Sequence, residues 1–203
     1  MTQILEFYKA IDKLDFRENR RELVMSYVLR LLGLLVFGIL FYELYVNLNQ
    51  QIQFKSLVSI EIENVSPIIS MLLLVLDIVF ILYLHELLHA AIFYLTYNQK
   101  PDIGINGWII YAAAPNQVLN KRDLIINALS PFVILSTLGV VLLANSTAPI
   151  APWIFIPTII NAAASGGDFM VVYFVLKHRK DIHYNDTGDV IYAVKYNVQE
   201  NEK

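Results

Sequence analysis

Four long apolar stretches restrict the folds open to this sequence more than any other feature. They run approximately over residues 27–46, 67–97, 124–144 and 152–176. A helix needs about 20 predominantly apolar residues to cross a bilayer, so each stretch is long enough. Hydrophobic residues make up 57% of the chain, more than soluble domains usually carry. We therefore expect an all-α membrane protein with about four transmembrane helices.

The distribution of Lys and Arg orients these helices. Five basic residues lie in the leading segment, three in the middle loop and five in the tail, whereas the loops 47–66 and 145–151 hold only Lys55. By the positive-inside rule, both termini and the middle loop are cytoplasmic. We expect a multi-pass protein of the cell membrane. Its predicted parts are a cytoplasmic amphipathic helix within residues 1–24, a single transmembrane domain over residues 25–177 and a cytoplasmic tail over residues 178–203.

The remaining composition narrows the chemistry and the partners. The chain has no cysteine, which excludes disulfides and thiolate ligands and leaves His and carboxylates for any metal. The formal net charge is -3, and no basic stripe is present. We therefore expect no nucleic-acid partner and place the chain against the lipid bilayer.

The second apolar stretch contains His85, Glu86, Leu87, Leu88 and His89, which form an H-E-x-x-H motif. Residues four apart lie on one face of a helix, so the two imidazoles can converge on a single metal ion. Glu86 then lies where it can take a proton from an attacking water. Ionisable residues inside a membrane are costly and usually functional. The alternative is that the two histidines cap a helix end or face a polar cleft without metal.

A catalytic zinc site normally takes three protein ligands, so a third donor is needed. Asp77 lies on the same predicted helix as His85, about 12 Å away along its axis, which is too far for a shared ion. Asp168 lies in the fourth stretch at a similar depth, after small residues that permit close helix contact. We predict Zn²⁺ bound by His85, His89 and Asp168, although Asp168 paired with Lys or Arg is an alternative. Asn161, two turns earlier, is predicted to orient a ligand or hold a substrate carbonyl.

An intramembrane H-E-x-x-H helix followed by a membrane helix that offers Asn161 and Gly167-Asp168 resembles the site-2 protease class. The short chain resembles in particular the small bacterial putative zincin peptidase family. The resemblance implies that His85, His89 and Asp168 bind zinc and that Glu86 is the catalytic base. The fourth stretch departs from the class pattern, because alanines follow Asn161 where the class has prolines.

The middle loop, residues 101–115, has a hairpin signal at Asn106-Gly107 between β-prone residues. Such a hairpin can bind an unwound substrate segment by β-addition. An ordinary interfacial loop anchored by Trp108 is an equally good interpretation. In the tail, the strand-like run over residues 190–194 predicts a small additional element. The role of Asp77, as an outer contact, a proton relay or a partner of a neighbouring helix, stays open.

We predict a membrane-embedded zinc metalloprotease that hydrolyses membrane or membrane-proximal peptides, with Glu86 as general base. One rival is a membrane scaffold or binding protein whose metal site is structural or degenerate. A second rival is a small ion-coupled transporter that uses Asp77, Glu86 and Asp168 as a path. A transporter of that kind commonly carries an inverted repeat, and the sequence contains no convincing one.

Overall fold

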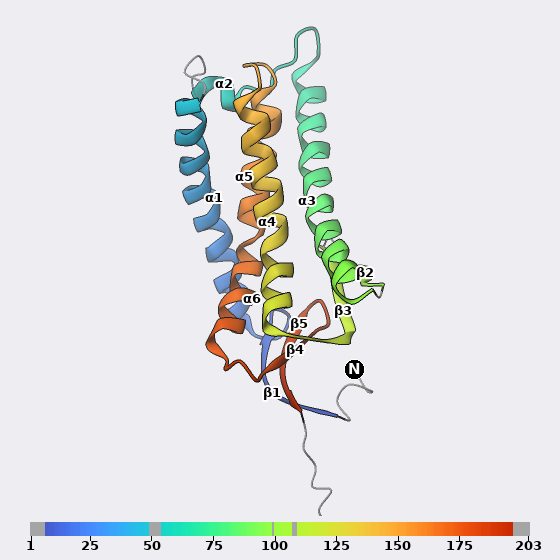
Figure 1. Ribbon diagram of the computed structural model, residues 1–203. Coiled ribbons are helices and arrows are strands. Elements are labelled where there is room, and N and C mark those ends of the chain that lie inside the picture. The colour runs from blue at the N-terminus through green and yellow to red at the C-terminus, as the bar shows by residue number, and fades with distance from the viewer. Residues whose placement is uncertain (1–6, 49–53, 99, 107–108, 197–203) are drawn as a thin grey trace, which may run out of the picture. The chain divides into compact units, whose positions relative to one another are not determined.

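The computed structural model describes residues 7–48, 54–98, 100–106 and 109–196. Figure 1 shows the helices and strands. The helices are α1 (Arg20–Leu48), α2 (Phe54–Val58), α3 (Pro67–Tyr97), α4 (Lys121–Ala144), α5 (Ala151–Ala164) and α6 (Gly166–Lys177). The strands are β1 (Tyr8–Asp15), β2 (Asp102–Asn106), β3 (Ile109–Leu119), β4 (His183–Asp186) and β5 (Val190–Tyr196).

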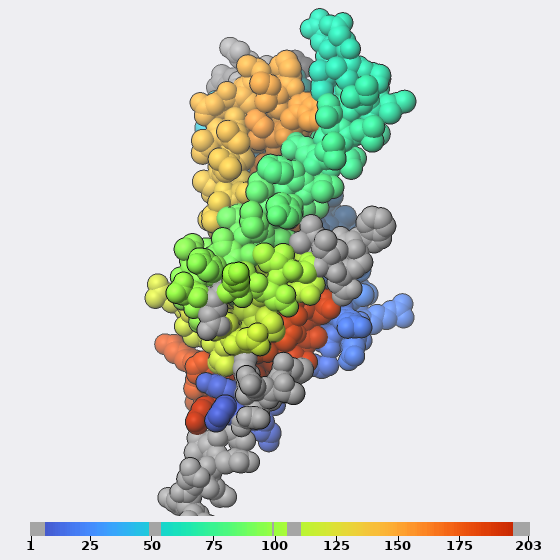
Figure 2. Space-filling view, turned by 90° about the vertical axis from the view of Figure 1, so that its right-hand side faces the viewer, coloured from blue at the N-terminus to red at the C-terminus, as the bar shows by residue number. Residues whose placement is uncertain are grey.

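The four predicted spans are confirmed as helices long and apolar enough to cross a membrane. They are α1, α3, α4 and the segment Ala151–Lys177, which contains both α5 and α6. Large apolar side chains are exposed along α1 and α3, as expected for surfaces that face lipid. Ile68, Met71, Leu72 and Leu76 of α3 are examples, and Figure 2 shows the amino-terminal part of α3 in cyan at the molecular surface. The chain is therefore a multi-pass membrane protein by the length and composition of its helices.

The contacts divide the chain into two compact units, and each collects separate parts of the sequence. Unit 1 contains Met1–Ser26, Leu87–Leu129 and Asp168–Lys203, and unit 2 contains Tyr27–Glu86 and Ser130–Gly167. The continuous helix α3 contributes to both. The prediction that residues 25–177 form a single domain with two cytoplasmic flanks stays a prediction.

Unit 1 contains a five-stranded antiparallel sheet in the order β1-β5-β4-β3-β2. The predicted hairpin is confirmed, because β2 pairs with β3 from Asp102 opposite Ala113 to Asn106 opposite Ile109. Gly107 and Trp108, at its predicted turn, lie outside the described residues. The predicted strand-like run in the tail is confirmed as β5. The protein is therefore mainly helical but not all-α, since its sheet joins the leading segment, the middle loop and the tail.

The predicted amphipathic helix in residues 1–24 is wrong over Tyr8–Asp15, whereas Arg20 and the residues after it are helical as the start of α1. Tyr8–Asp15 form β1, which pairs with β5 over most of its length. Asp15 ends the strand, because its Oδ1 accepts hydrogen bonds from the backbone N–H groups of Arg17 and Glu18. A hydrogen bond from the Lys13 ammonium lowers the pKa of the Asp15 carboxyl. Strand pairing with a distant segment outweighs a weak local helix preference here.

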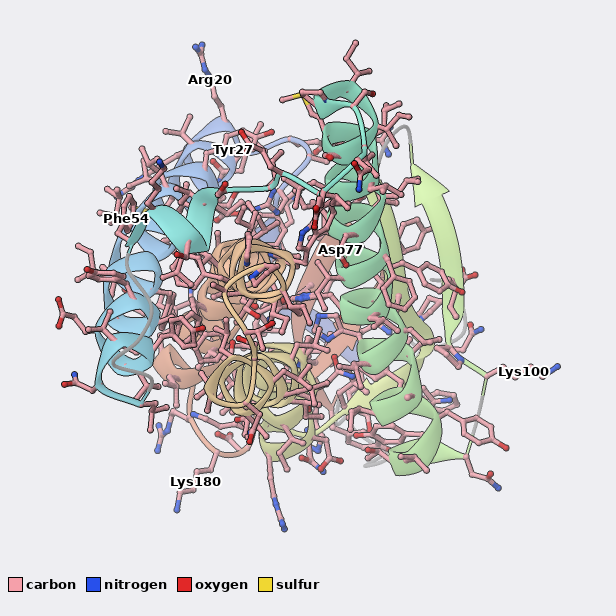
Figure 3. The ribbon with its side chains drawn as sticks, turned by 90° about the horizontal axis from the view of Figure 1, so that it is seen from above. Arg20, Tyr27, Phe54, Asp77, Lys100 and Lys180 are labelled. Atoms are coloured by element: carbon pink, nitrogen blue, oxygen red, sulfur yellow. The ribbon has the colours of Figure 1, made fainter. Side chains whose placement is uncertain are left out.

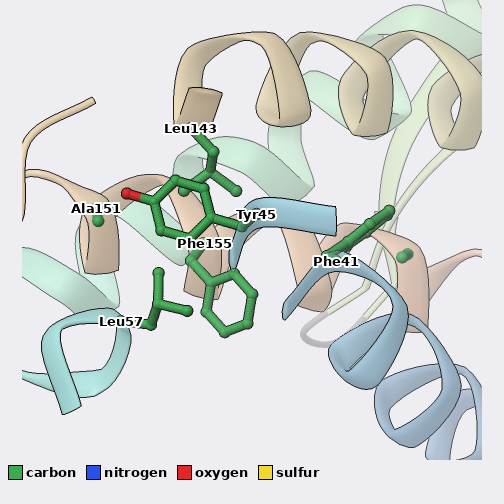
Figure 4. Close-up of a cluster of buried hydrophobic side chains, with 7 residues drawn as sticks. Phe41, Tyr45, Leu57, Leu143, Ala151 and Phe155 are labelled. Carbon is green, nitrogen blue, oxygen red and sulfur yellow. The ribbon is translucent and has the colours of Figure 1, made fainter. Parts of the chain in front are cut away.

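Unit 2 is built on helices packed around one apolar cluster. Its buried members are Phe41, Tyr45, Leu57, Leu143, Ala151, Phe155 and Ala162, most of which are labelled in Figure 4. They come from α1, α2, α4 and α5. Helices α4 and α5 approach closely at Gly139, where a Cβ atom would overlap the Thr158 side chain. Small residues of this kind allow membrane helices to pack closely, because van der Waals contact replaces the hydrophobic effect in lipid.

Candidate metal centre

Helix α3 carries both histidines of the H-E-x-x-H motif on one face. It runs without interruption from Pro67 to Tyr97, so His85 and His89 lie one turn apart. Both side chains are buried, with exposed fractions of 4% and 8%. Glu86 is half-buried and next to His85 in the same turn. A buried pair of imidazoles at this spacing is the arrangement that the motif predicts.

Asp168 lies in the first turn of α6, because the fourth span is divided at Ser165 into the helices α5 and α6. Helix α5 ends at Ser165, whose backbone N–H and Oγ both donate to the carbonyl oxygen of Asn161. Helix α6 then begins at Gly166, so Asp168 is in its first turn. The positive end of the helix dipole favours a carboxylate at this position. The Asp168 Oδ1 lies 3.4 Å from the Nε2 of His89.

The three predicted ligands have donor atoms close enough to share one ion. One ligand atom from each of His85, His89 and Asp168 lies within 4.8 Å of the others. Two ligands of a tetrahedral zinc ion, with bonds of about 2.0–2.1 Å, are about 3.3 Å apart, and the His89–Asp168 separation matches that value. Two imidazoles and one carboxylate are also a donor set that catalytic zinc sites use. The three residues therefore fit a zinc ion.

The hydrogen bonds of Asn161 fix the orientation of His85. Asn161 is fully buried, and its Nδ2 donates to the backbone oxygen of Pro131 at 3.4 Å. Its Oδ1 therefore faces the Nδ1 of His85, at 2.9 Å, as the acceptor. A neutral imidazole has one N–H, so this bond places the proton on Nδ1 and the lone pair on Nε2. The predicted orienting role of Asn161 has the contact that it requires.

His89 has an equivalent contact that the sequence analysis missed. Its Nδ1 lies 3.1 Å from both the backbone oxygen and the Oδ1 of Asn127. The Nδ2 of Asn127 donates to the backbone oxygen of His89, so the Oδ1 is again the acceptor. His89 therefore also directs Nε2 toward Asp168. The sequence signal for this contact is Asn127 itself, which lies four residues before Pro131 in the third apolar stretch.

Asp77 is not part of this donor group. Among the described residues, the group that could hold a metal contains Asp168 and not Asp77. Asp77 is half-buried on α3 (Figure 3), more than two turns before His85.

In the middle loop, a cavity of about 260 Å³ lies at the base of the hairpin. It is lined by Lys100, Pro101, Asp102, Ala114, Pro115, Asn116 and Gln117.

The chain belongs to the putative zincin peptidase family. Residues 78–183 match the sequence model of that family, which is more than half of the chain. The match contains His85, Glu86, His89, Asn161 and Asp168. A search of curated proteins and a search of solved structures each found no match to the chain. Family membership and the buried donor group together indicate a metallopeptidase with a metal ion, for which zinc is the expected element.

Proposed function

We propose that this protein is a membrane-embedded zinc endopeptidase, similar to the site-2 protease class, that cleaves membrane or membrane-proximal peptides. The observation that carries the proposal is that His85 and His89, beside Glu86 on the apolar helix α3, have donor atoms close to one of Asp168 on α6. Two buried imidazoles beside a half-buried carboxylate would be costly in this environment without a compensating ion. Membership of a zincin family adds independent support.

The proposed reaction divides the work between the ion and Glu86. Zinc held by the two Nε2 atoms and Asp168 would lower the pKa of a water molecule and polarise the peptide carbonyl. The Glu86 carboxylate accepts a proton from the attacking water as a C–O bond forms at the carbonyl carbon. Glu86 then donates this proton to the amide nitrogen as the C–N bond breaks. The products are one carboxylate and one amine.

The metal requirement is tested with purified protein in detergent and unfolded casein as the probe. We expect about one zinc per chain, because the three predicted ligands form a single site. Removing zinc with a chelator should stop the cleavage, and adding zinc should restore it. Fragment analysis and elemental analysis measure the two quantities. Failure to bind zinc after reconstitution would contradict the proposal. Zinc binding without hydrolysis of casein or of membrane peptides would favour the scaffold with a structural metal.

We also propose that both termini and the middle loop are cytoplasmic. The excess of Lys and Arg in these segments favours this side. Strands β1, β2–β3 and β4–β5 come from the same three segments and form one sheet, which requires the segments to lie on one side of the membrane. The histidines then lie toward the cytoplasmic end of α3.

Cysteine labelling tests this topology cleanly, because the native chain has no cysteine. Thr147→Cys, between α4 and α5, should react with a membrane-impermeant maleimide added from outside intact cells. Lys180→Cys, after α6 (Figure 3), should react only after the membrane is opened. Thr147 and Lys180 are both exposed, so accessibility within the fold does not separate them. The reverse labelling pattern would invert the proposed orientation.

A further inference from the structure

The turn of α4 over residues 127–131 contacts His89 directly and is linked to His85 through Asn161. Asn127 binds the Nδ1 of His89 through its backbone oxygen and its Oδ1. The backbone oxygen of Pro131 accepts from Asn161, which in turn accepts from the Nδ1 of His85. Asn127 is 4% exposed and Asn161 is fully buried, so water is largely kept away from these bonds.

Pro131 explains why a backbone oxygen of a helix can accept a bond from His89. In an α-helix the oxygen of residue 127 normally accepts the N–H of residue 131. Proline has no N–H, so Pro131, inside α4, leaves the Asn127 oxygen without its usual helical donor. The Nδ1 of His89 lies at hydrogen-bonding distance from that oxygen. Pro131 therefore leaves the Asn127 backbone oxygen able to accept a hydrogen bond from His89.

We propose that Asn127 and Pro131 are positioning residues for the metal centre, and that they act by holding His89 with its proton on Nδ1 and its Nε2 toward the ion. The inference rests on the proposed function, since it concerns the same site. Bonds of this kind to metal-binding histidines fix the tautomer and the ring orientation. Their loss typically weakens metal affinity by about 10- to 100-fold.

Zinc titration of the metal-free protein against a chromophoric chelator tests the role of Asn127. Asn127→Ala should weaken zinc binding by about 10- to 100-fold, and it should change the visible spectrum of the cobalt-substituted protein. Asn127→Asp keeps an acceptor for His89 and should retain most of the affinity. The matched control is Asn145→Ala, directly after the same helix, where the side chain donates to the oxygen of Val141. This control should bind zinc like the wild type.

Pro131→Ala tests the backbone acceptor separately. The new N–H of residue 131 competes with His89 for the Asn127 oxygen, so zinc affinity should fall by about 10-fold. Pro157→Ala, also a proline inside a helix, is the control and should leave the affinity unchanged. Thermal unfolding identifies any variant that does not fold, and the remaining variants then decide the result.

Three outcomes distinguish a failure of this inference from a failure of the proposed function. Wild-type affinity and an unchanged cobalt spectrum in Asn127→Ala and Pro131→Ala would overturn the positioning role and leave the proposed function intact. Equal losses in Asn127→Ala and Asn127→Asp would also overturn it, because the acceptor would not be the cause. A wild-type protein that binds no zinc would remove the proposed function itself.

Discussion

Glu86→Gln should lower peptide hydrolysis by about 10²- to 10⁴-fold while zinc stays bound, because a positioned general base contributes that much to the rate. Gln keeps the shape of Glu86 but cannot accept the proton. The matched control is Glu43→Gln, which changes an exposed carboxylate on α1 and should leave both activity and zinc unchanged.

The Glu86 variant is measured by casein cleavage and elemental analysis of the same preparation. Loss of zinc from Glu86→Gln would mean that Glu86 is a ligand or a structural group and not the base. Wild-type cleavage by this variant would remove the proposed mechanism. The comparison therefore distinguishes a base from a ligand in one experiment.

Asp168→Ala should weaken zinc binding by roughly three orders of magnitude. In zinc-finger peptides, whose sites have four protein ligands, zinc binding is worth about 10–16 kcal/mol. At the upper end of this range one ligand accounts for about 4 kcal/mol, which is a factor of about a thousand in affinity. Asp77→Ala is the matched control, because it removes another aspartate from an apolar span without touching the donor group. It should keep the zinc affinity. Chelator competition measures both variants, and weaker binding in the Asp77 variant alone would contradict the site.

The parts that the sequence predicts well depend on local patterns. Apolar length identifies the four spans, since lipid requires it, and helical periodicity places His85 and His89 on one face. Asn106-Gly107 indicates the β2–β3 hairpin because of its turn geometry. In each case the interactions that determine the structure lie within a few residues, and the structure agrees with the prediction.

The missed parts depend on contacts between distant segments. β1 is a strand because β5 supplies its hydrogen-bond partners from the other end of the chain, and no local pattern reveals that pairing. Asn127 contacts His89 because the fold brings these parts of α4 and α3 together, although they are 38 residues apart in the sequence. Its sequence signal, a proline four residues later, has meaning only when the neighbouring histidine is known.

The position of β5 within the sheet has a consequence for how the protein is made. β5 lies between β1 and β4, yet of the five strands of this sheet it is synthesised last. Of the same five strands, β1 is synthesised first. Its partner β5 does not exist until the candidate membrane spans between them have been translated. Its unpaired edge is an aggregation hazard during that time. β1 carries the charged residues Lys9, Asp12 and Lys13. Charged side chains on an unpaired strand oppose its aggregation with other strands. Because β1 pairs with β5, the five-stranded sheet is complete only after the candidate membrane spans between these two strands have been synthesised.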